Sequence, residues 1–203
     1  MRCWLGVDVG AAQKGFDVAL VDDHELLLLR SRLDCEGVIG VAESARPRLV
    51  AVDSPRHCAN DGERSRPGER QLARAICGIR WTPDERRVRA NPYYAWIVAG
   101  LMLYDVLADR AVDAIEVFPT ASWTRWHGTR DGRSRSMWTK QALASLGLDG
   151  IPARTNQDQR DAIAAAFTGR QHSLGLTESI GEIVVPFERA AAGRDLRKAS
   201  PRR

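Results

Sequence analysis

The stretch at residues 3–22, "CWLGVDVGAAQKGFDVALVD", predicts how the fold begins. Residues 3–9 form an apolar run with one carboxylate, which is the pattern of a short buried strand. "GAAQKG" then turns the chain, and "FDVALVD" at 16–22 returns as a second strand. After one more turn, "ELLLLRSRL" at 25–33 has the pattern of a third strand. We therefore expect a three-stranded antiparallel meander at this end of the chain.

Helix and strand patterns alternate after the meander. "RLVAVDSP" and "DAIEVFP" are apolar strands that end near a proline, and "SIGEIVVP" has the pattern of a final strand. A polar, Arg-rich stretch with Gly and Pro runs from about residue 55 to 92. The helical patterns are "CEGVIGVAESA" (35–45), "GERQLARAIC" (68–77), "YYAWIVAGLMLYDVLA" (93–108), "WTKQALASLGL" (138–148) and "NQDQRDAIAAAFTG" (156–169). This order predicts an α/β domain with a mixed sheet, whose working groups gather at the strand ends.

Length and composition restrict the class of protein. The chain has 203 residues, of which 44% are hydrophobic and 28% charged, as in an ordinary globular protein. We expect one domain over residues 1–188 and a basic, disordered tail over 189–203. No membrane contact is expected, because no apolar run has the length of a membrane span. The four cysteines form no CxxC pair, which predicts reduced thiols and a cytoplasmic location.

The net charge of +4 is unevenly distributed. Residues 189–203 hold six basic side chains and one acidic, so the rest of the chain is close to −1. Within that rest, residues 56–89 and 122–140 each carry +4, and what remains is distinctly acidic. Basic segments around an acidic centre suit a metal site that handles a polyanion. The alternative is that both segments are solvated surface loops.

Acidic residues interrupt several of the apolar runs. Asp8, Asp53 and Glu116 lie in predicted strands, while Asp158 and Asp161 share one face of a predicted helix. A buried carboxylate is costly unless it is paired or bound to a metal. Each one alone also fits a helix cap, a strand-end turn or an ion pair with a nearby Arg. Together they predict an oxygen-rich site for Mg²⁺ or Mn²⁺, of the kind that cleaves phosphodiester bonds.

The sequence resembles the ribonuclease H-like superfamily and, within it, the domain-of-unknown-function family 429, a family of predicted nucleases. The motifs that carry this resemblance are "GVDVG" (6–10), "AVDSP" (51–55), "GERQLAR" (68–74), "EVFPTAS" (116–122), "WTKQAL" (138–143), "DQRDAIAAAFTG" (158–169) and "GEIVVP" (181–186). Their order and spacing, rather than any single motif, are similar to the family, and they span nearly the whole chain apart from the basic tail.

This resemblance implies a central five-stranded mixed sheet flanked by helices and a metal-dependent nuclease activity. It implies that Asp8 is central, that Asp158 and Asp161 face it, and that Asp53 or Glu116 lies beside it. All five are therefore candidate catalytic residues, with Asp8, Glu116, Asp158 and Asp161 as candidate ligands of Mg²⁺ or Mn²⁺. Asp53 could instead hold a turn, and Glu116 could instead pair with an arginine of the helix at 68–77. The partner would be nucleic acid, with DNA and RNA both open.

Basic side chains supply candidate phosphate contacts. Arg70 and Arg74 are spaced i, i+4 and would project from one helix face, either to bind phosphate or to pair with a neighbouring glutamate. Lys140 matches a lysine of the family's motif, and Lys14 lies in the first turn. Three tryptophans, Trp123, Trp126 and Trp138, lie among the arginines of residues 122–140 and fit base stacking, whereas the helical spacing of Trp123 and Trp126 also fits a core position.

Two alternatives to a nuclease stay open at this stage. A protein of the same fold can bind nucleic acid or a nucleotide without catalysis, because fold does not fix function. The sugar-kinase and actin superfamily also opens with Asp and a Gly-containing hairpin, although that fold needs two such domains. A nuclease requires at least three carboxylates within about 5 Å of a common point, because metal–oxygen bonds are roughly 2.0–2.6 Å long. A binding protein would tolerate carboxylates that are dispersed or paired with arginines.

Overall fold

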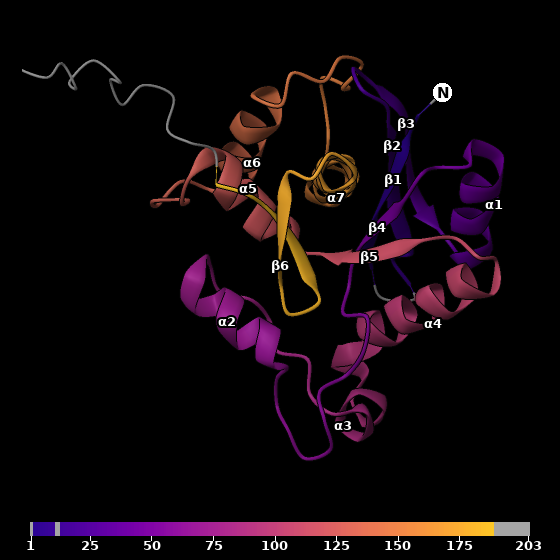
Figure 1. Cartoon of the computed structure of the whole chain (residues 1–203), viewed down its shortest axis with the longest axis vertical. Helices are drawn as coiled ribbons and strands as arrows, with labels where there is room; N and C mark the ends of the chain where they lie inside the picture. The colour runs from indigo at the N-terminus through magenta and orange to yellow at the C-terminus, as the bar shows by residue number, and fades with distance from the viewer. Residues whose placement is uncertain (1, 11–12, 189–203) are drawn as a thin grey trace, which may run out of the picture.

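The computed structural model of the chain describes residues 2–10 and 13–188 (Figure 1). The tail that the sequence predicts over 189–203 lies outside the described residues. A single mixed sheet of seven strands, in the order β3-β2-β1-β4-β5-β7-β6, forms the centre of this part of the chain. None of the helices in these described ranges combines the length and the apolar character of a membrane span.

The N-terminal meander forms as the sequence pattern predicts. Strands β1 (Trp4–Val9), β2 (Phe16–Val21) and β3 (Leu26–Leu33) pair antiparallel in chain order. The amide of Gly10 donates to the carbonyl of Gly15 at 3.1 Å, which closes the first turn. Gly15 has a φ of +71°, a conformation that few residues other than glycine adopt.

The expected number of strands was wrong, because the sheet has seven rather than five. Strands β4 (Val50–Asp53) and β5 (Ala114–Val117) continue the sheet, each parallel to its neighbour on the β1 side. A C-terminal hairpin of β6 (Thr177–Ile180) and β7 (Ile183–Pro186) then adds two strands, with β7 parallel to β5. The four parallel strands therefore end at one edge of the sheet.

Helices cover both faces of the sheet (Figure 1). On one face, α1 (Cys35–Ala45) and α4 (Ala95–Asp109) pack on an apolar cluster that includes Leu5 and Val7 of β1. On the other face, α7 (Gln157–Ser173) packs on a cluster that includes Trp4, with α5 (Pro119–His127) and α6 (Arg135–Ala144) against it. Alternation along β1 thus sends even-numbered side chains toward α7 and odd-numbered ones toward α4.

α7 lies unusually close to the middle of the sheet. A Cβ at Gly6 would be 2.1 Å from the carbonyl oxygen of Ala162, so only glycine fits in β1 at this position. The alanines at positions 162, 164, 165 and 166 are fully buried, and their small side chains allow this approach. The close packing brings the first turn of α7 to the carboxyl ends of the strands.

A long connection between β4 and α4, residues 54–94, lies beyond the same edge of the sheet. It contains α2 (Pro67–Ala75), α3 (Glu85–Ala90) and the short 3-10 helix η1 (Pro92–Tyr94). The sequence predicted α2 but not α3, and it predicted no helix for α5, because the proline at 119 read only as the end of a strand. Pro119 is instead the first residue of α5, where a missing amide costs nothing.

Candidate active site

Three aspartates lie side by side at the edge of the sheet where the parallel strands end. Asp8 of β1 is in register with Asp17 of β2 on one side and with Asp53 of β4 on the other. Residues in register point to the same face, and this face is the one that α7 covers. The strand pairing alone therefore gathers three carboxylates beneath the start of α7.

The first turns of α7 add two more carboxylates. Asn156 caps this helix by accepting from the amide of Gln159 at 2.8 Å, and Oε1 of Gln159 accepts from the backbone amide of Asn156 at 2.9 Å. This capping box fixes where the helix begins, and so places Asp158 and Asp161 above the strand ends. Carboxylate oxygens of Asp8, Asp17 and Asp158 all lie within 4.8 Å of one another.

Burial and mutual repulsion raise the pKa values of these carboxyls. Burial, followed by the charges of Asp161 and Asp158, raises the pKa of Asp8 to about 8. Burial and the charge of Asp8 raise the pKa of Asp53 well above its usual range. Burial also raises the pKa of Asp17, against a hydrogen bond of 2.5 Å from the Ser31 hydroxyl. The cluster holds more negative charge than its own cations neutralise, which is the condition under which a bound cation is favoured.

Asp161 has a different environment from the rest of the cluster. Its Oδ1 accepts from the indole Nε1 of Trp123 at 2.8 Å, and its Oδ2 accepts from Nη2 of Arg135 at 2.8 Å. The Gln157 amide donates to both oxygens at 3.0 Å. Burial raises the pKa of Asp161, and the charge of Arg135 lowers it. Both oxygens of Asp161 already accept from protein donors. Asp161 is therefore suited to contribute a fixed negative charge and to orient the side chains around it, rather than to bind a cation directly.

Basic side chains surround the carboxylates. Nζ of Lys14, from the turn between β1 and β2, lies 2.7 Å from Oδ2 of Asp158. Lys14 and Arg135 line a cleft of about 1050 Å³ that also contains Asp8, Asp53, Asp158 and Asp161. Arg80 and Arg130 line the same cleft from the β4–α4 connection and from the loop after α5. The cleft therefore combines an acidic floor with cationic sides.

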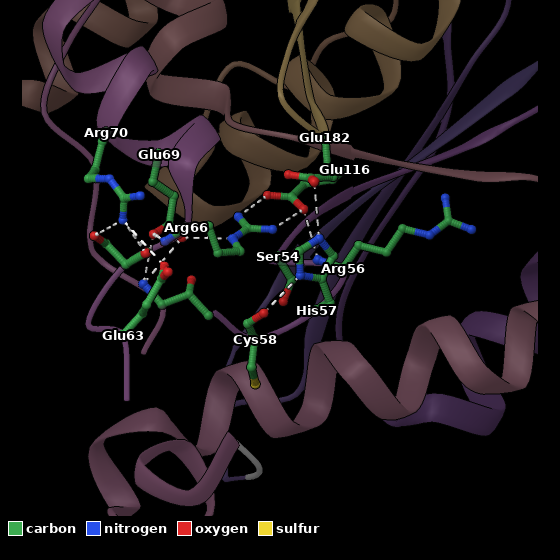
Figure 2. Close-up of polar contacts among 12 residues, drawn as sticks. Ser54, Arg56, His57, Cys58, Glu63, Arg66, Glu69, Arg70, Glu116 and Glu182 are labelled. Atoms are coloured by element: carbon green, nitrogen blue, oxygen red, sulfur yellow. Dashed lines mark hydrogen bonds and ion pairs between the residues drawn. The ribbon is translucent and has the colours of Figure 1, made fainter. Parts of the chain in front are cut away.

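Glu116 takes part in a different interaction. It is in register with Val52, not with Asp53, so strand alternation turns it toward the face that α4 covers. There Arg66 binds it through both terminal nitrogens, with Nη1 donating to Oε2 at 2.7 Å, and the amide of Arg56 donates to the same oxygen at 2.8 Å (Figure 2). The pairing with an arginine that the sequence left open for Glu116 is thus present, but the partner is Arg66.

The other predicted phosphate contacts lie outside the cleft. Nη1 of Arg70 donates to the carbonyl of Ser65 at 2.5 Å and is 3.6 Å from Oε2 of Glu63, so the glutamate pairing considered for this residue is observed (Figure 2). Arg74 and Lys140 are exposed to solvent. Among the four basic candidates from the sequence, Lys14 is the one found among the cleft-lining residues.

The three tryptophans of residues 122–140 are buried in the core around α7. Trp123 donates to Asp161, Trp126 donates to the side chain of Gln171 at 3.0 Å, and Trp138 donates to the carbonyl of Gly128 at 3.1 Å. These tryptophans therefore belong to the core, and their buried rings are not available for base stacking.

Sequence reasoning did not single out Asp17, Arg66 or Arg135 as site residues. Asp17 had a usable signal, because a hairpin that turns between Gly10 and Gly15 pairs residue 8 with residue 17. Arg66 had none, since its partner Glu116 is 50 positions away along the chain. Arg135 belonged to a basic segment in which nothing distinguished it from its neighbours.

The structural likenesses to known proteins are too distant to carry an argument about this chain. No protein-family model matches the chain, and no curated protein matches it in sequence. A structure of Thermus thermophilus RuvC is similar at 15% identity with a TM-score of 0.47, over 86% of this chain and 97% of that one. A second structure, T. thermophilus RuvC in complex with a Holliday junction substrate, is similar at 14% identity with a TM-score of 0.49, over the same shares. We transfer no residue role from likenesses of this degree.

Proposed function

We propose that the protein is a metal-dependent nuclease that hydrolyses phosphodiester bonds of nucleic acid. The observation that carries this proposal is the convergence of Asp8, Asp17 and Asp158, whose oxygens lie within 4.8 Å of one another. This spacing supports the proposal, because a metal-dependent nuclease requires at least three carboxylates close to a common point. Membership of the domain-of-unknown-function family 429 stays a prediction from the sequence motifs.

The donor set fits a hard divalent cation. The available ligand atoms are carboxylate oxygens, which suit Mg²⁺ or Mn²⁺ and offer nothing to a soft metal. Asp8, Asp17 and Asp158 would hold the cation, with Asp53 beside Asp8 on the neighbouring strand and Asp161 behind. Bound there, the cation would lower the pKa of water and offset charge on the phosphodiester. We prefer Asp53 to Glu116 as the carboxylate of a neighbouring parallel strand that completes the site, because Glu116 faces Arg66 on the other side of the sheet.

The chain's own cations would bind and orient the substrate. Lys14 is 2.7 Å from Asp158 and is positioned to exchange that carboxylate for a phosphate oxygen. Arg135 is half-exposed and pairs with Asp161 through Nη2, and its other donors, which have no partner among the described residues, can contact the strand. Trp123 and Gln157 hold Asp161 in one orientation, which would keep its negative charge at a fixed position near the bound phosphodiester.

A non-catalytic nucleic-acid-binding protein is the second candidate. The ion pair Lys14–Asp158 favours it, because Lys14 neutralises a carboxylate that a catalytic cation would otherwise use. The sugar-kinase and actin alternative has no observation in its favour among the described residues, which form one sheet.

Calorimetric titration with Mn²⁺ and with Mg²⁺ separates the two candidates. Wild type is expected to bind the cation, and Asp8→Asn is expected to lose that binding because it removes one charged ligand at the centre. Glu36→Gln, an exposed carboxylate on α1, is the matched control and should bind like wild type. Absence of binding by wild type, both alone and with a non-cleavable oligonucleotide, would leave the binding protein as the function.

A further inference from the structure

The cleft continues well beyond the carboxylates. The sheet order places the ends of β1, β4 and β5 in sequence along the edge, so the floor runs from Asp8 past Asp53 to Phe118, just after β5. At the Phe118 end the lining includes the apolar side chains of Ile76 and Ile79 from the β4–α4 connection, together with the Arg66–Glu116 ion pair, Glu69 and Arg80. A volume of about 1050 Å³ exceeds what a metal site requires and suits an organic ligand.

The apolar side of the cleft is held in place by buried ion pairs. Arg66 joins the start of α2 to Glu116 of β5, and its Nε donates to Glu69 at 3.1 Å (Figure 2). Glu69 in turn accepts from the amide of Thr82 at 3.0 Å, which closes residues 69–82 into a loop. Ile76 and Ile79 lie within this loop and pack partly on the core cluster around Leu72. The apolar side is thus formed before any ligand binds.

Trp96 borders the same cleft and carries a hydrogen-bond donor that has no partner among the described residues. This donor, Nε1, is buried, although indole N–H groups in proteins are usually satisfied. Trp96 lies in the first turn of α4, on the face of the sheet opposite α7. One turn later Gly100 packs against Ser54, with room for no Cβ, which fixes the start of α4 at the strand ends.

The chemistry of the cleft describes its ligand. The cations at Lys14, Arg80, Arg130 and Arg135 favour an anionic ligand. The side formed by Ile76, Ile79 and Phe118 favours a ligand with a flat apolar surface. The Trp96 indole N–H, which has no partner among the described residues, favours a ligand with a hydrogen-bond acceptor. A nucleotide combines all three. We propose that this part of the cleft, bounded by Ile76, Ile79, Phe118 and Trp96, binds the base of an unpaired nucleotide whose phosphodiester lies at the carboxylates. This base subsite rests on the proposed nuclease function and names its substrate as single-stranded or locally unpaired nucleic acid.

A paired base does not meet these requirements. In a duplex the faces of a base are stacked on its neighbours, so the apolar side could be contacted only after the base leaves the stack. Extrusion costs a few kcal/mol, and a strand that is already unpaired avoids that cost. The subsite therefore predicts a preference for single strands over duplexes in binding, before any cleavage takes place.

The test measures binding of a short single-stranded oligodeoxynucleotide that carries one fluorescent adenine analogue. Titrations are run in EDTA and again in Ca²⁺, for wild type, Ile79→Ala and Trp96→Phe. Met102→Ala, an exposed apolar side chain on α4 outside the cleft, is the matched control. We expect Ile79→Ala to weaken binding about fivefold or more, by loss of base contact. Trp96→Phe keeps a ring but removes the donor, and we expect a loss of roughly threefold.

The outcomes separate this subsite from the nuclease itself. The subsite is supported if either variant binds the single strand more weakly than wild type in either buffer. The control variant should then bind the single strand like wild type, and all the variants should bind a duplex of the same sequence like wild type. Wild-type affinity in both variants, or equal affinity of wild type for duplex and single strand, overturns it. If adenosine monophosphate binds as tightly as the strand, the ligand is a free nucleotide and the proposal is wrong. Loss of the nuclease function would show instead in the cation titration with Asp8→Asn, which does not involve these residues. Should Ile79→Ala not fold, as judged by circular dichroism, Trp96→Phe decides alone.

Discussion

Two groups of buried carboxylates lie at the same edge of the sheet, on opposite faces, and they are stabilised in opposite ways. On the α4 face, Glu116 and Glu69 are bound by the guanidinium of Arg66, which is 1% exposed. On the α7 face, Asp8, Asp17 and Asp53 crowd together, and burial raises the pKa of each. The comparison teaches that burial of a carboxylate does not identify a functional site. The group that lacks enough matching cations is the one suited to bind a cation from solution.

The largest effect is expected from breaking the neutralised group. Arg66→Met leaves two buried carboxylates without their guanidinium and should lower the free energy of unfolding by about 3–5 kcal/mol. Urea denaturation followed by circular dichroism measures this loss. Arg74→Met, on an exposed face of the same helix α2, is the control and should stay within about 0.5 kcal/mol of wild type. A small loss in Arg66→Met would mean that the pairing is not what fixes the β4–α4 connection.

The crowded group is expected to respond to pH in the absence of metal. The pKa of Asp8 is about 8 in the folded protein against 3.8 unfolded. Because folding raises this pKa, the folded protein favours the neutral Asp8 carboxyl. The contribution of Asp8 to the free energy of unfolding is therefore fully present below about pH 4 and is lost as the pH rises through about 8. Asp8→Asn stays neutral, so we expect it to exceed wild type in stability by on the order of 2 kcal/mol at pH 9.

Urea denaturation at pH 4 and pH 9, in EDTA, measures this difference. At pH 4 the two proteins should differ much less, since Asp8 is then protonated in the folded state. Greater stability of wild type at pH 9 would contradict the repulsion that we infer within the cluster.

A matched pair of tryptophan substitutions tests which core contacts serve the site. Trp123→Phe removes the donor to Asp161, and Trp126→Phe removes the donor to Gln171. Each should lower the free energy of unfolding by about 1 kcal/mol, because one buried hydrogen bond is lost. Only Trp123→Phe should also change the calorimetric affinity for Mn²⁺. Equal affinities in the two variants would mean that the orientation of Asp161 does not matter to the cation.

The smallest effect is expected from single lysines in contact with nucleic acid. Lys14→Ala should weaken binding of a single strand and reduce the slope of log affinity against log salt by about 1, as for the loss of one phosphate contact. Lys140→Ala, which the sequence motif favoured, should leave both quantities unchanged because Lys140 lies outside the cleft. Fluorescence titration at several salt concentrations measures both variants. The reverse result would move the bound strand from the cleft to the exposed face of α6.

Local sequence patterns predicted much of the fold. The meander, α1, α2, α4, α6 and α7 follow from the periodicity of apolar residues and from turn residues, which act over a few positions. The C-terminal hairpin was the main failure. Gly181, with a φ of +62°, reverses the chain between β6 and β7, and nothing local indicates that β7 will pair with β5. Helix α5 was missed because a proline that ends a strand and one that begins a helix look the same in sequence.

The sequence by itself determined which carboxylates are costly, since Asp8, Asp53, Glu116 and Asp161 all interrupt apolar segments that have to be buried. It could not determine their partners. Strand register puts Asp53 beside Asp8 but Glu116 beside Val52, and a shift of one residue sends a side chain to the other face of the sheet. Tertiary structure alone therefore decided that Glu116 binds Arg66 while Asp53 joins the aspartates. Burial is fixed by the local pattern of apolar residues, whereas charge pairing depends on segments distant in sequence that meet only in the folded chain.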